Sequence, residues 1–220
     1  MTIQAILFDH DGTLVDSEPE HHKHWAEVLI HFNVVLELQF YKEHYAGLPC
    51  EATAINMASH FNLSIDPLLL AERKNSKTRE YLSQAAFPLM PGTIETLDYF
   101  YDAGLTLAVV TGANREGINA TLKFHQLDKY FSTIVSKDDV KTSKPAPDCY
   151  QLALQNLGLD VHQAIALEDT EHGVISAVAA ELICLAIPNE MSLSHDFDAA
   201  NVTVDSLLAA KSWIIANHLS

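Results

Sequence analysis

Short apolar runs alternate with longer helical patterns along most of the chain. The apolar runs lie at residues 3–8, 105–111, 133–136, 164–167 and 182–187, with a weaker run near residue 202. Such runs predict buried strands. Helical patterns separate them at residues 93–103, 115–124, 146–157, 173–180 and 207–217. We therefore expect an α/β fold with a doubly wound parallel sheet, both faces of which are covered by helices.

The stretch between the first apolar run and residue 88 has a purely helical pattern. Trp25, Val28 and Phe32 recur at steps of three and four residues, and Pro19 suits the first turn of the same helix. Further helical patterns follow at residues 38–45, 51–61 and 67–86. We therefore expect an all-helical cap domain at residues 16–88, inserted into a core that consists of residues 1–15 and 89–220.

The composition is that of an ordinary globular protein, and its charge excludes several classes of partner. Lys and Arg number 13 against 29 Asp and Glu, so the formal net charge is −16. Such a charge repels nucleic acid and anionic membranes, and we expect neither as a partner. Cys50, Cys149 and Cys184 form no metal-binding pattern, which predicts reduced thiols.

The first strand begins without a basic and apolar leader, so we expect no signal peptide and a cytoplasmic protein. The most apolar later stretch, residues 173–188, is too short for a membrane span and contains Glu181. We expect a monomer, with a dimer as the alternative.

Two carboxylates follow the first apolar run directly. Asp9 and Asp11 come at the end of the predicted strand, and Gly12 lets the chain turn away tightly. Ligands of open α/β sheets bind beyond the carboxyl ends of the strands. Because side chains alternate along an extended segment, we expect Asp9 and Asp11 to point to one side and His10 to point away. Two neighbouring carboxylates need a cation, and hard oxygen ligands suit Mg²⁺.

Three later segments place further polar residues at strand ends or in the turns beyond them. The second apolar run ends in Thr111, followed by Gly112 before a predicted helix, whose free backbone amides suit a phosphate. Lys144 lies on a proline-flanked turn, where its charge would neutralise a phosphoryl group. Glu168 and Asp169 end another strand and predict further ligands for the metal.

The four segments together resemble the motifs of the haloacid dehalogenase-like phosphohydrolases. DHDGTLVDSE at residues 9–18 is similar to the family's first motif, and VVTGAN at residues 109–114 is similar to the second. KPAPD at residues 144–148 is similar to the third, and EDT at residues 168–170 is similar to the fourth. The helical stretch also lies where the family carries its helical cap. The resemblance spans essentially the whole chain and implies a Rossmann-like catalytic core.

The resemblance implies a role for each motif residue. Asp9 would be the nucleophile that forms an aspartyl-phosphate, and Asp11 would be the general acid and base. Thr111 and Lys144 would complete the catalytic set by holding the phosphoryl group. The implied ligands of Mg²⁺ are Asp9, Asp11 through its backbone carbonyl, Glu168 and Asp169.

Several cap positions resemble those of β-phosphoglucomutases, a sugar-phosphate group within the family. His21 and Lys74 match a histidine and a lysine that contact the substrate or the acid/base there, and Gly47 matches a break between helices. Cys50 replaces an arginine that grips the distal phosphate in the mutases. Ala113 and Asn114 replace a serine and a lysine, for which the adjacent Arg115 would substitute. The expected substrate-binding residues are His21, Gly47, Lys74, Gly112, Ala113, Asn114 and Arg115.

These departures favour hydrolysis over mutase chemistry, because a mutase must hold a bisphosphate at both ends. We expect a Mg²⁺-dependent phosphatase that acts on a small phosphorylated metabolite, with sugar phosphates among the candidates. The alternatives are a β-phosphoglucomutase-type mutase and a non-catalytic relative that binds phosphate and metal. A phospho-acceptor receiver domain would carry its acceptor Asp well downstream of the acidic pair and would have no helical insert. Glu181 stands where relatives commonly carry glycine.

Overall fold

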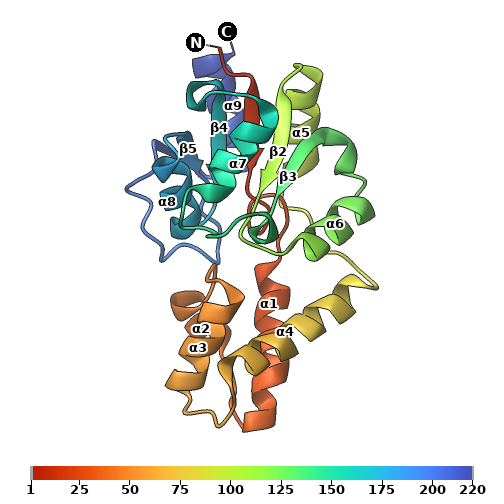
Figure 1. Ribbon diagram of the computed structural model, residues 1–220, viewed down its shortest axis with the longest axis vertical. Coiled ribbons are helices and arrows are strands. Elements are labelled where there is room, and N and C mark those ends of the chain that lie inside the picture. The colour runs from red at the N-terminus through yellow and green to blue at the C-terminus, as the bar shows by residue number, and fades with distance from the viewer. Residues whose placement is uncertain (1, 220) are drawn as a thin grey trace.

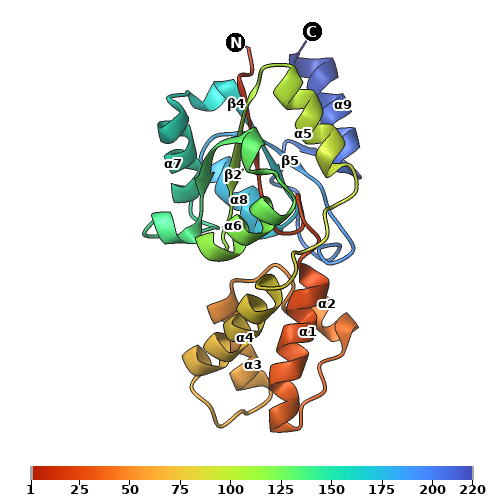
Figure 2. The same ribbon diagram turned by 90° about the vertical axis from the view of Figure 1, so that its right-hand side faces the viewer.

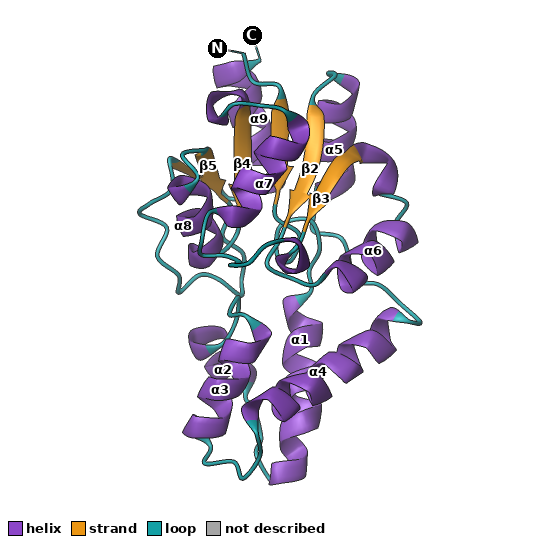
Figure 3. Cartoon of the chain, in the orientation of Figure 1, coloured by secondary structure: helices purple, strands orange, loops and turns teal. Residues whose placement is uncertain are grey.

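Six parallel strands form one sheet within residues 2–219, the part of the chain that the computed structural model describes. They are β1 (Ala5–Phe8), β2 (Thr106–Val110), β3 (Phe131–Val135), β4 (Ala164–Glu168), β5 (Ile183–Ala186) and β6 (Val202–Thr203). Their order across the sheet is β3-β2-β1-β4-β5-β6. Figure 3 labels β3, β2, β4 and β5 in that arrangement. This is the strand order of a doubly wound fold, so the predicted fold class is confirmed.

One face of the sheet carries large apolar side chains. Alternate residues of β1 and β4, including Phe8 and Leu167, point into a cluster with residues from three helices. These helices are α5 (Thr93–Asp102), α6 (Arg115–Phe124) and α9 (Leu207–His218). Figure 2 shows α5 and α9 on one side of the strands and the helix of residues 148–157 on the other.

The opposite face of the sheet carries mostly small side chains. Its alanines come from four neighbouring strands: Ala5, Ala108, Ala164, Ala166 and Ala186. Against them pack α7 (Asp148–Leu157) and α8 (Glu171–Ala179). Because side chains in a protein interior are close-packed, small residues on the sheet bring these two helices near the strands.

Four helices form a separate layer beyond the carboxyl ends of the strands (Figure 1). They are α1 (Glu18–Leu29), α2 (Leu38–His44), α3 (Cys50–His60) and α4 (Pro67–Leu82), and we call this layer the cap. Trp25, Met57 and Leu70 are buried in a hydrophobic cluster within it. The cluster also takes in Met191, which comes from the segment after β5. The expected domain limits, residues 16–88 for the cap and residues 1–15 and 89–220 for the core, stay a prediction.

The last cap helix is shorter than its helical pattern, which extends to residue 86. It ends at Leu82 because the chain turns tightly there, where the amides of Gln84 and Ala85 both donate to the carbonyl of Tyr81. Phe87 then enters the hydrophobic cluster of the core. The remaining helical turns are η1 (Ile30–Phe32), η2 (Asp128–Tyr130), η3 (Lys137–Asp139) and η4 (Val161–Gln163). Within residues 2–219, no helix has the length and apolar character needed to cross a membrane.

Glu181 ends α8 in a backbone conformation that favours glycine. Its φ is 64°, in the left-handed region. Its amide donates to the carbonyl of Val178, and the amide of Leu182 donates to the carbonyl of Ala177. This is the hydrogen-bond pattern of a helix end that glycine commonly closes. The conformation therefore explains the expectation that glycine is favoured at the position of Glu181.

We expect Glu181→Gly to raise the free energy of unfolding by up to about 1 kcal/mol, because glycine adopts the left-handed region without strain. Urea denaturation of the two proteins measures the difference. Glu181→Ala is the matched control, since it keeps the Cβ atom, and should change the stability by less than about 0.5 kcal/mol. A glycine variant that is no more stable than the alanine variant would contradict this account.

Candidate active site

Three buried carboxylates meet where the strand order of the sheet reverses. Asp9 follows β1, Glu168 is the last residue of β4, and Asp169 comes next. β1 and β4 are adjacent, so their carboxyl ends bring the three side chains together. Each offers an oxygen, and these oxygens all lie within 4.8 Å of one another. We call these three residues the carboxylate cluster.

Lys144 is the cation that holds this cluster together. Its Nζ donates to Asp9 Oδ1 and to Glu168 Oε1, both at 2.6 Å, and to the carbonyl of Val110 at 2.7 Å. All three ammonium donors are thereby used. Tyr150 of α7 donates its hydroxyl to the same Glu168 oxygen, and its ring lies 5.1 Å from Lys144 Nζ. Sequence reasoning placed Lys144 here but missed Tyr150, which carries no motif signal.

Burial changes the proton affinity of these groups. It raises the pKa of Asp9 to about 7, with Lys144 lowering it and Glu168 raising it. Burial and the neighbouring carboxylates of Asp9 and Glu168 raise the pKa of Asp169 well above its usual range. Burial opposes the charge of Lys144, but the carboxylates of Asp9 and Glu168 outweigh it and raise the pKa of this lysine. The cluster is therefore crowded with negative charge that one ammonium does not neutralise.

The carboxylate cluster fits a divalent cation such as Mg²⁺. Its donors are all hard carboxylate oxygens, and Glu168 Oε2 is buried without a hydrogen-bond partner among the described residues. Two glycines leave room for the carboxylates. A Cβ atom on Gly12 would lie 1.9 Å from Asp169 Oδ2, and a Cβ atom on Gly173 would lie 1.9 Å from Glu168 Oε2. The backbone carbonyl of Asp11 as a ligand stays a prediction.

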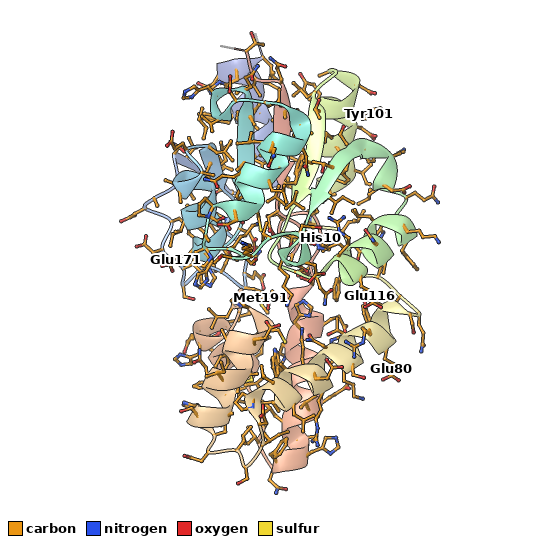
Figure 4. All side chains as sticks on the ribbon, viewed as in Figure 1. His10, Glu80, Tyr101, Glu116, Glu171 and Met191 are labelled. Atoms are coloured by element: carbon orange, nitrogen blue, oxygen red, sulfur yellow. The ribbon has the colours of Figure 1, made fainter. Side chains whose placement is uncertain are left out.

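Asp11 faces two histidines and lies outside the carboxylate cluster. Its Oδ2 is 3.2 Å from Nδ1 of His10, and its Oδ1 is 3.9 Å from Nε2 of His21. Burial opposes ionisation, but His10 lowers the pKa of Asp11 below its usual range. The expectation that His10 points away is wrong. β1 ends at Phe8, so the alternation of an extended strand does not continue to these residues. Figure 4 labels His10 at the end of the core that faces the cap.

His21 and Lys74 reach this site from two cap helices. Lys74 Nζ lies 3.2 Å from His21 Nδ1. An ammonium can only donate, so His21 accepts at Nδ1 and carries its proton on Nε2, the atom nearest Asp11. Burial and the nearby Lys74 lower the pKa of His21 well below its usual value. The structure thus brings His21, one of the expected cap residues, close to Asp11, and Lys74 lies directly behind it.

The end of β2 supplies backbone and side-chain groups to the same space. Thr111 is buried, and its hydroxyl accepts a hydrogen bond from the amide of Ala113 at 3.0 Å. Asn114 begins α6, and its side chain accepts from the amide of Gly117 at 3.3 Å. Gly112 lines the cavity beside them. The segment that we expected to bind phosphate therefore lies beside Asp9, because β2 is the direct neighbour of β1.

Arg115 is directed away from the site. Its guanidinium donates to Asp139 and to the carbonyl of Ile134. Asn114 and Glu116 are among the described residues that line the cavity, but Arg115 is not. The structure therefore corrects its expected role in substrate binding. The physical reason is that η3 presents Asp139, and Asp138 accepts from the backbone amide of Arg115.

A cavity of about 550 Å³ lies between the core and the cap and contains these groups. Gly47 and Cys50 line its cap side, as expected from their positions in the sequence. Sequence reasoning missed Glu18, whose carboxylate accepts from the Tyr41 hydroxyl at 2.6 Å and from the Gly47 amide at 3.2 Å. It also missed Lys137, which crosses the cavity rim to pair with Glu51 of α3. The position of Glu18 at the end of the first motif was the only feature of the sequence that could have predicted its place in the cavity.

The sequence of the chain matches a known family over most of its length. A model of the family described as haloacid dehalogenase-like hydrolase matches residues 6–187. The chain belongs to this family. The four motif segments therefore lie within the matched part, and the family generally uses Mg²⁺, which agrees with the donors of the carboxylate cluster.

Relatives of this hydrolase extend the likeness to the whole chain. The protein CbbY of Rhodobacter capsulatus is 32% identical over 225 residues, which cover 98% of this chain and 98% of that one. Fructose-1-phosphate phosphatase YqaB of Escherichia coli is 32% identical over 176 residues, 80% of this chain and 92% of that one. A solved structure of CbbY from Rhodobacter sphaeroides with xylulose-(1,5)bisphosphate has a TM-score of 0.81 at 26% identity. It covers 93% of this chain and 95% of that chain.

We expect Lys144→Met to lower the free energy of unfolding by about 3–5 kcal/mol in metal-free buffer, because two buried carboxylates lose their cation. Urea denaturation measures the loss. Lys141→Met is the matched control, since Lys141 is exposed on the same turn and should change stability by less than about 0.5 kcal/mol. Equal losses in the two variants would show that Lys144 does not hold the cluster.

We also expect Mg²⁺ to raise the Tm more in alkaline than in acidic buffer. Between the pKa of a free Asp, about 4, and the raised pKa of Asp9, about 7, the folded chain keeps a proton that the unfolded chain releases. Stability from this group is therefore lost as the pH rises through that window. Mg²⁺ competes with this proton for Asp9, so the increase in Tm that Mg²⁺ causes becomes larger as the pH rises through the same window.

Thermal unfolding with and without Mg²⁺ at about pH 5 and about pH 8 measures this difference. The control is an equal ionic strength of KCl, which screens charge but does not bind as a divalent ion. A Tm increase that is the same at both pH values, or that KCl reproduces, would contradict Mg²⁺ binding at the carboxylate cluster.

Proposed function

We propose that this protein is a Mg²⁺-dependent phosphatase that hydrolyses a small phosphomonoester through an aspartyl-phosphate. The observation that carries this proposal is the position of Asp9. Its carboxylate accepts from the Lys144 ammonium, which also binds Glu168, and it lines the same cavity as Thr111, Gly112, Ala113 and Asn114. A phosphoryl group in that space would meet a nucleophile, a fixed cation and a helix N-terminus together.

Several residues act together in the first step, the formation of the aspartyl-phosphate. Asp9 attacks phosphorus with its second oxygen, because Lys144 already binds Oδ1. The hydroxyl of Thr111 and the amides before α6 bind the phosphoryl oxygens, while Lys144 offsets their charge. Mg²⁺, when bound by the carboxylate cluster, would reduce the repulsion between Asp9 and the phosphate anion. The leaving oxygen departs toward the cap.

Asp11 serves as the general acid and then as the general base. In the empty site it is a carboxylate, since His10 lowers its pKa. A phosphate dianion beside Asp11 raises that pKa, so substrate binding favours the protonated form that donates to the leaving oxygen. The carboxylate that results then removes a proton from the water that hydrolyses the aspartyl-phosphate. His21 Nε2 lies 3.9 Å from Asp11 Oδ1, so its proton is close enough to stabilise the carboxylate form of Asp11 electrostatically.

The cap side of the cavity suits a polyhydroxylated leaving group. His21, Lys74 and Glu18 provide donors and acceptors there, and Trp25 provides an apolar surface. The names of relatives point the same way, since one is a fructose-1-phosphate phosphatase and another binds xylulose-(1,5)bisphosphate in its solved structure. We therefore propose a sugar phosphate as the substrate class, with Gly47, Gly112, Ala113 and Asn114 lining the space around it.

Two observations favour hydrolysis over a β-phosphoglucomutase-type reaction. Cys50 stands in the cavity where a mutase requires an arginine, and Arg115 is occupied by Asp139. Neither residue grips a distal phosphate. A non-catalytic relative is the remaining alternative, although Asp9, Asp11 and Lys144 all have the side chains that the chemistry needs. The expected monomeric state and cytoplasmic location stay predictions.

A screen of sugar phosphates with Mg²⁺ separates these alternatives. Free phosphate and rearranged sugar phosphate are measured separately, and β-glucose 1-phosphate is tested with a trace of the bisphosphate. Phosphate release would support the phosphatase, and glucose 6-phosphate without phosphate release would support the mutase. Binding of vanadate without turnover of any substrate would support the non-catalytic relative.

We expect Asp9→Asn to reduce phosphate release by at least about 1,000-fold, because an amide cannot form the aspartyl-phosphate. The fold should persist, which circular dichroism and the Tm will check. Asp205→Asn is the control, since Asp205 is exposed and far along the chain from the motifs. Turnover by Asp9→Asn close to that of the control would exclude Asp9 as the nucleophile.

A further inference from the structure

The segment after β5 connects the carboxylate cluster with the cap. β5 ends at Ala186, and the chain then runs toward the cap before it returns to β6. Asn189 lies against the cluster, and Met191, two residues later, is buried in the hydrophobic cluster of the cap. Figure 4 labels Met191 where the core meets the cap. None of the four motifs includes this segment.

The side chain of Asn189 donates to one backbone group and to one side-chain group at the carboxylate cluster. Its Nδ2 donates to Asp169 Oδ2 at 2.8 Å and to the carbonyl of Gly12 at 3.1 Å. A Cβ atom on Gly12 would lie 2.9 Å from this nitrogen. Asn189 therefore joins the turn after β1 to the carboxylate after β4, which are the two sources of ligands in the carboxylate cluster.

These contacts leave one oxygen of Asp169 for a cation. Oδ2 accepts the amide hydrogen of Asn189, whereas Oδ1 is approached by the Thr13 hydroxyl at 3.4 Å, which is long for an O–H···O bond. A carboxylate that ligates a metal is commonly oriented by a donor on its other oxygen. The amide of Asn189 has this position, so it sets the direction in which Oδ1 points.

The orientation of Asn189 is fixed in turn by the segment that carries Met191. Asn189 Oδ1 accepts from the Met191 amide at 2.8 Å, and the Asn189 amide donates to the Ser192 hydroxyl at 3.1 Å. Met191 is only 7% exposed because the cap encloses it. A rotation of Asn189 would therefore have to disturb the turn that enters the cap.

A second contact holds the same segment against the cap. Gly47, in the break between α2 and α3, has a φ of 72° and packs so closely that a Cβ atom would lie 2.9 Å from His195 Cε1. Nδ1 of His195 accepts from the amide of Glu171, at the start of α8. The segment is thus fixed at two points, by Met191 within the cap and by His195 between cap and core.

We propose that Asn189 is a positioning residue for the metal ligand Asp169, and that Met191 fixes Asn189 by its insertion into the cap. This inference rests on the proposed function, because it requires Mg²⁺ at the carboxylate cluster. Its consequence is that the cap contributes to Mg²⁺ binding through the segment after β5, although no cap residue belongs to the carboxylate cluster. Substrate contacts on the cap and metal contacts on the core are then linked through Met191 and Asn189.

The first test measures Mg²⁺ binding to the full chain by titration calorimetry, after removal of metal and without substrate. We expect Asn189→Ala to raise the Kd for Mg²⁺ about 10- to 100-fold. Asn201→Ala is the matched control, since Asn201 lies on the same segment but accepts from the amide of Cys184, within β5, and does not contact the carboxylate cluster. Phosphate release by Asn189→Ala should recover toward the wild-type rate at saturating Mg²⁺.

The second test separates the role of Met191 from cap stability. Met191→Ala should raise the Kd for Mg²⁺ about two- to tenfold, although Met191 lies outside the metal site. Met57→Ala removes a methionine from the same cap cluster and should lower the Tm without changing this Kd. Met191→Leu keeps the volume and apolar character and should retain the wild-type Kd.

The outcomes distinguish this inference from the proposed function. A wild-type protein that binds no Mg²⁺ would overturn both. A wild-type protein that binds Mg²⁺ with an unchanged Kd in Asn189→Ala would overturn the positioning role alone. Equal changes of Kd in Met191→Ala and Met57→Ala would overturn the role of Met191, because loss of cap stability would then explain both.

Discussion

The burial of three carboxylates with a single ammonium is the constraint on which the rest of the structure depends. Asp9, Glu168 and Asp169 with Lys144 leave two negative charges, which a divalent cation would neutralise. Without metal, burial and mutual repulsion raise the pKa of Asp9 and of Asp169, so that bound protons neutralise part of the negative charge. A site of this kind is costly to bury. It stands only because the parallel sheet brings the ends of β1 and β4 together.

The two faces of the sheet contribute differently to that site. The face with large side chains forms the main hydrophobic cluster with α5, α6 and α9. The alanine-rich face lets α7 and α8 lie close to the strands. From there Tyr150 reaches Glu168, and Gly173 approaches the same carboxylate so closely that no side chain would fit. The packing of one face therefore shapes the surroundings of Glu168, although the helices contribute no residue to the carboxylate cluster.

The cavity lies between cap and core, so cap residues form part of its wall. The cap helices bring His21 close to Asp11 and Lys74 close to His21. Lys137 and Glu51 pair across the rim, and Met191 extends from the core into the cap cluster. Closure of such a lid excludes water from the reaction. Contacts between the two parts thus bring Asp11, the cap residue Lys74 and the segment that carries Met191 into a single arrangement.

The sequence by itself determined the α/β class, the bounds of most strands and helices, and the acids at the ends of β1 and β4. Apolar periodicity and turn residues are local signals, and four motifs in order identify the family. Only the tertiary structure decided which groups meet across the chain. Tyr150 and Asn189 join the site without a motif, Arg115 turns away to Asp139, and His10 turns toward Asp11 once β1 has ended. Such contacts depend on how helices and loops pack around the sheet, and neither hydrophobic periodicity nor motif spacing carries that information.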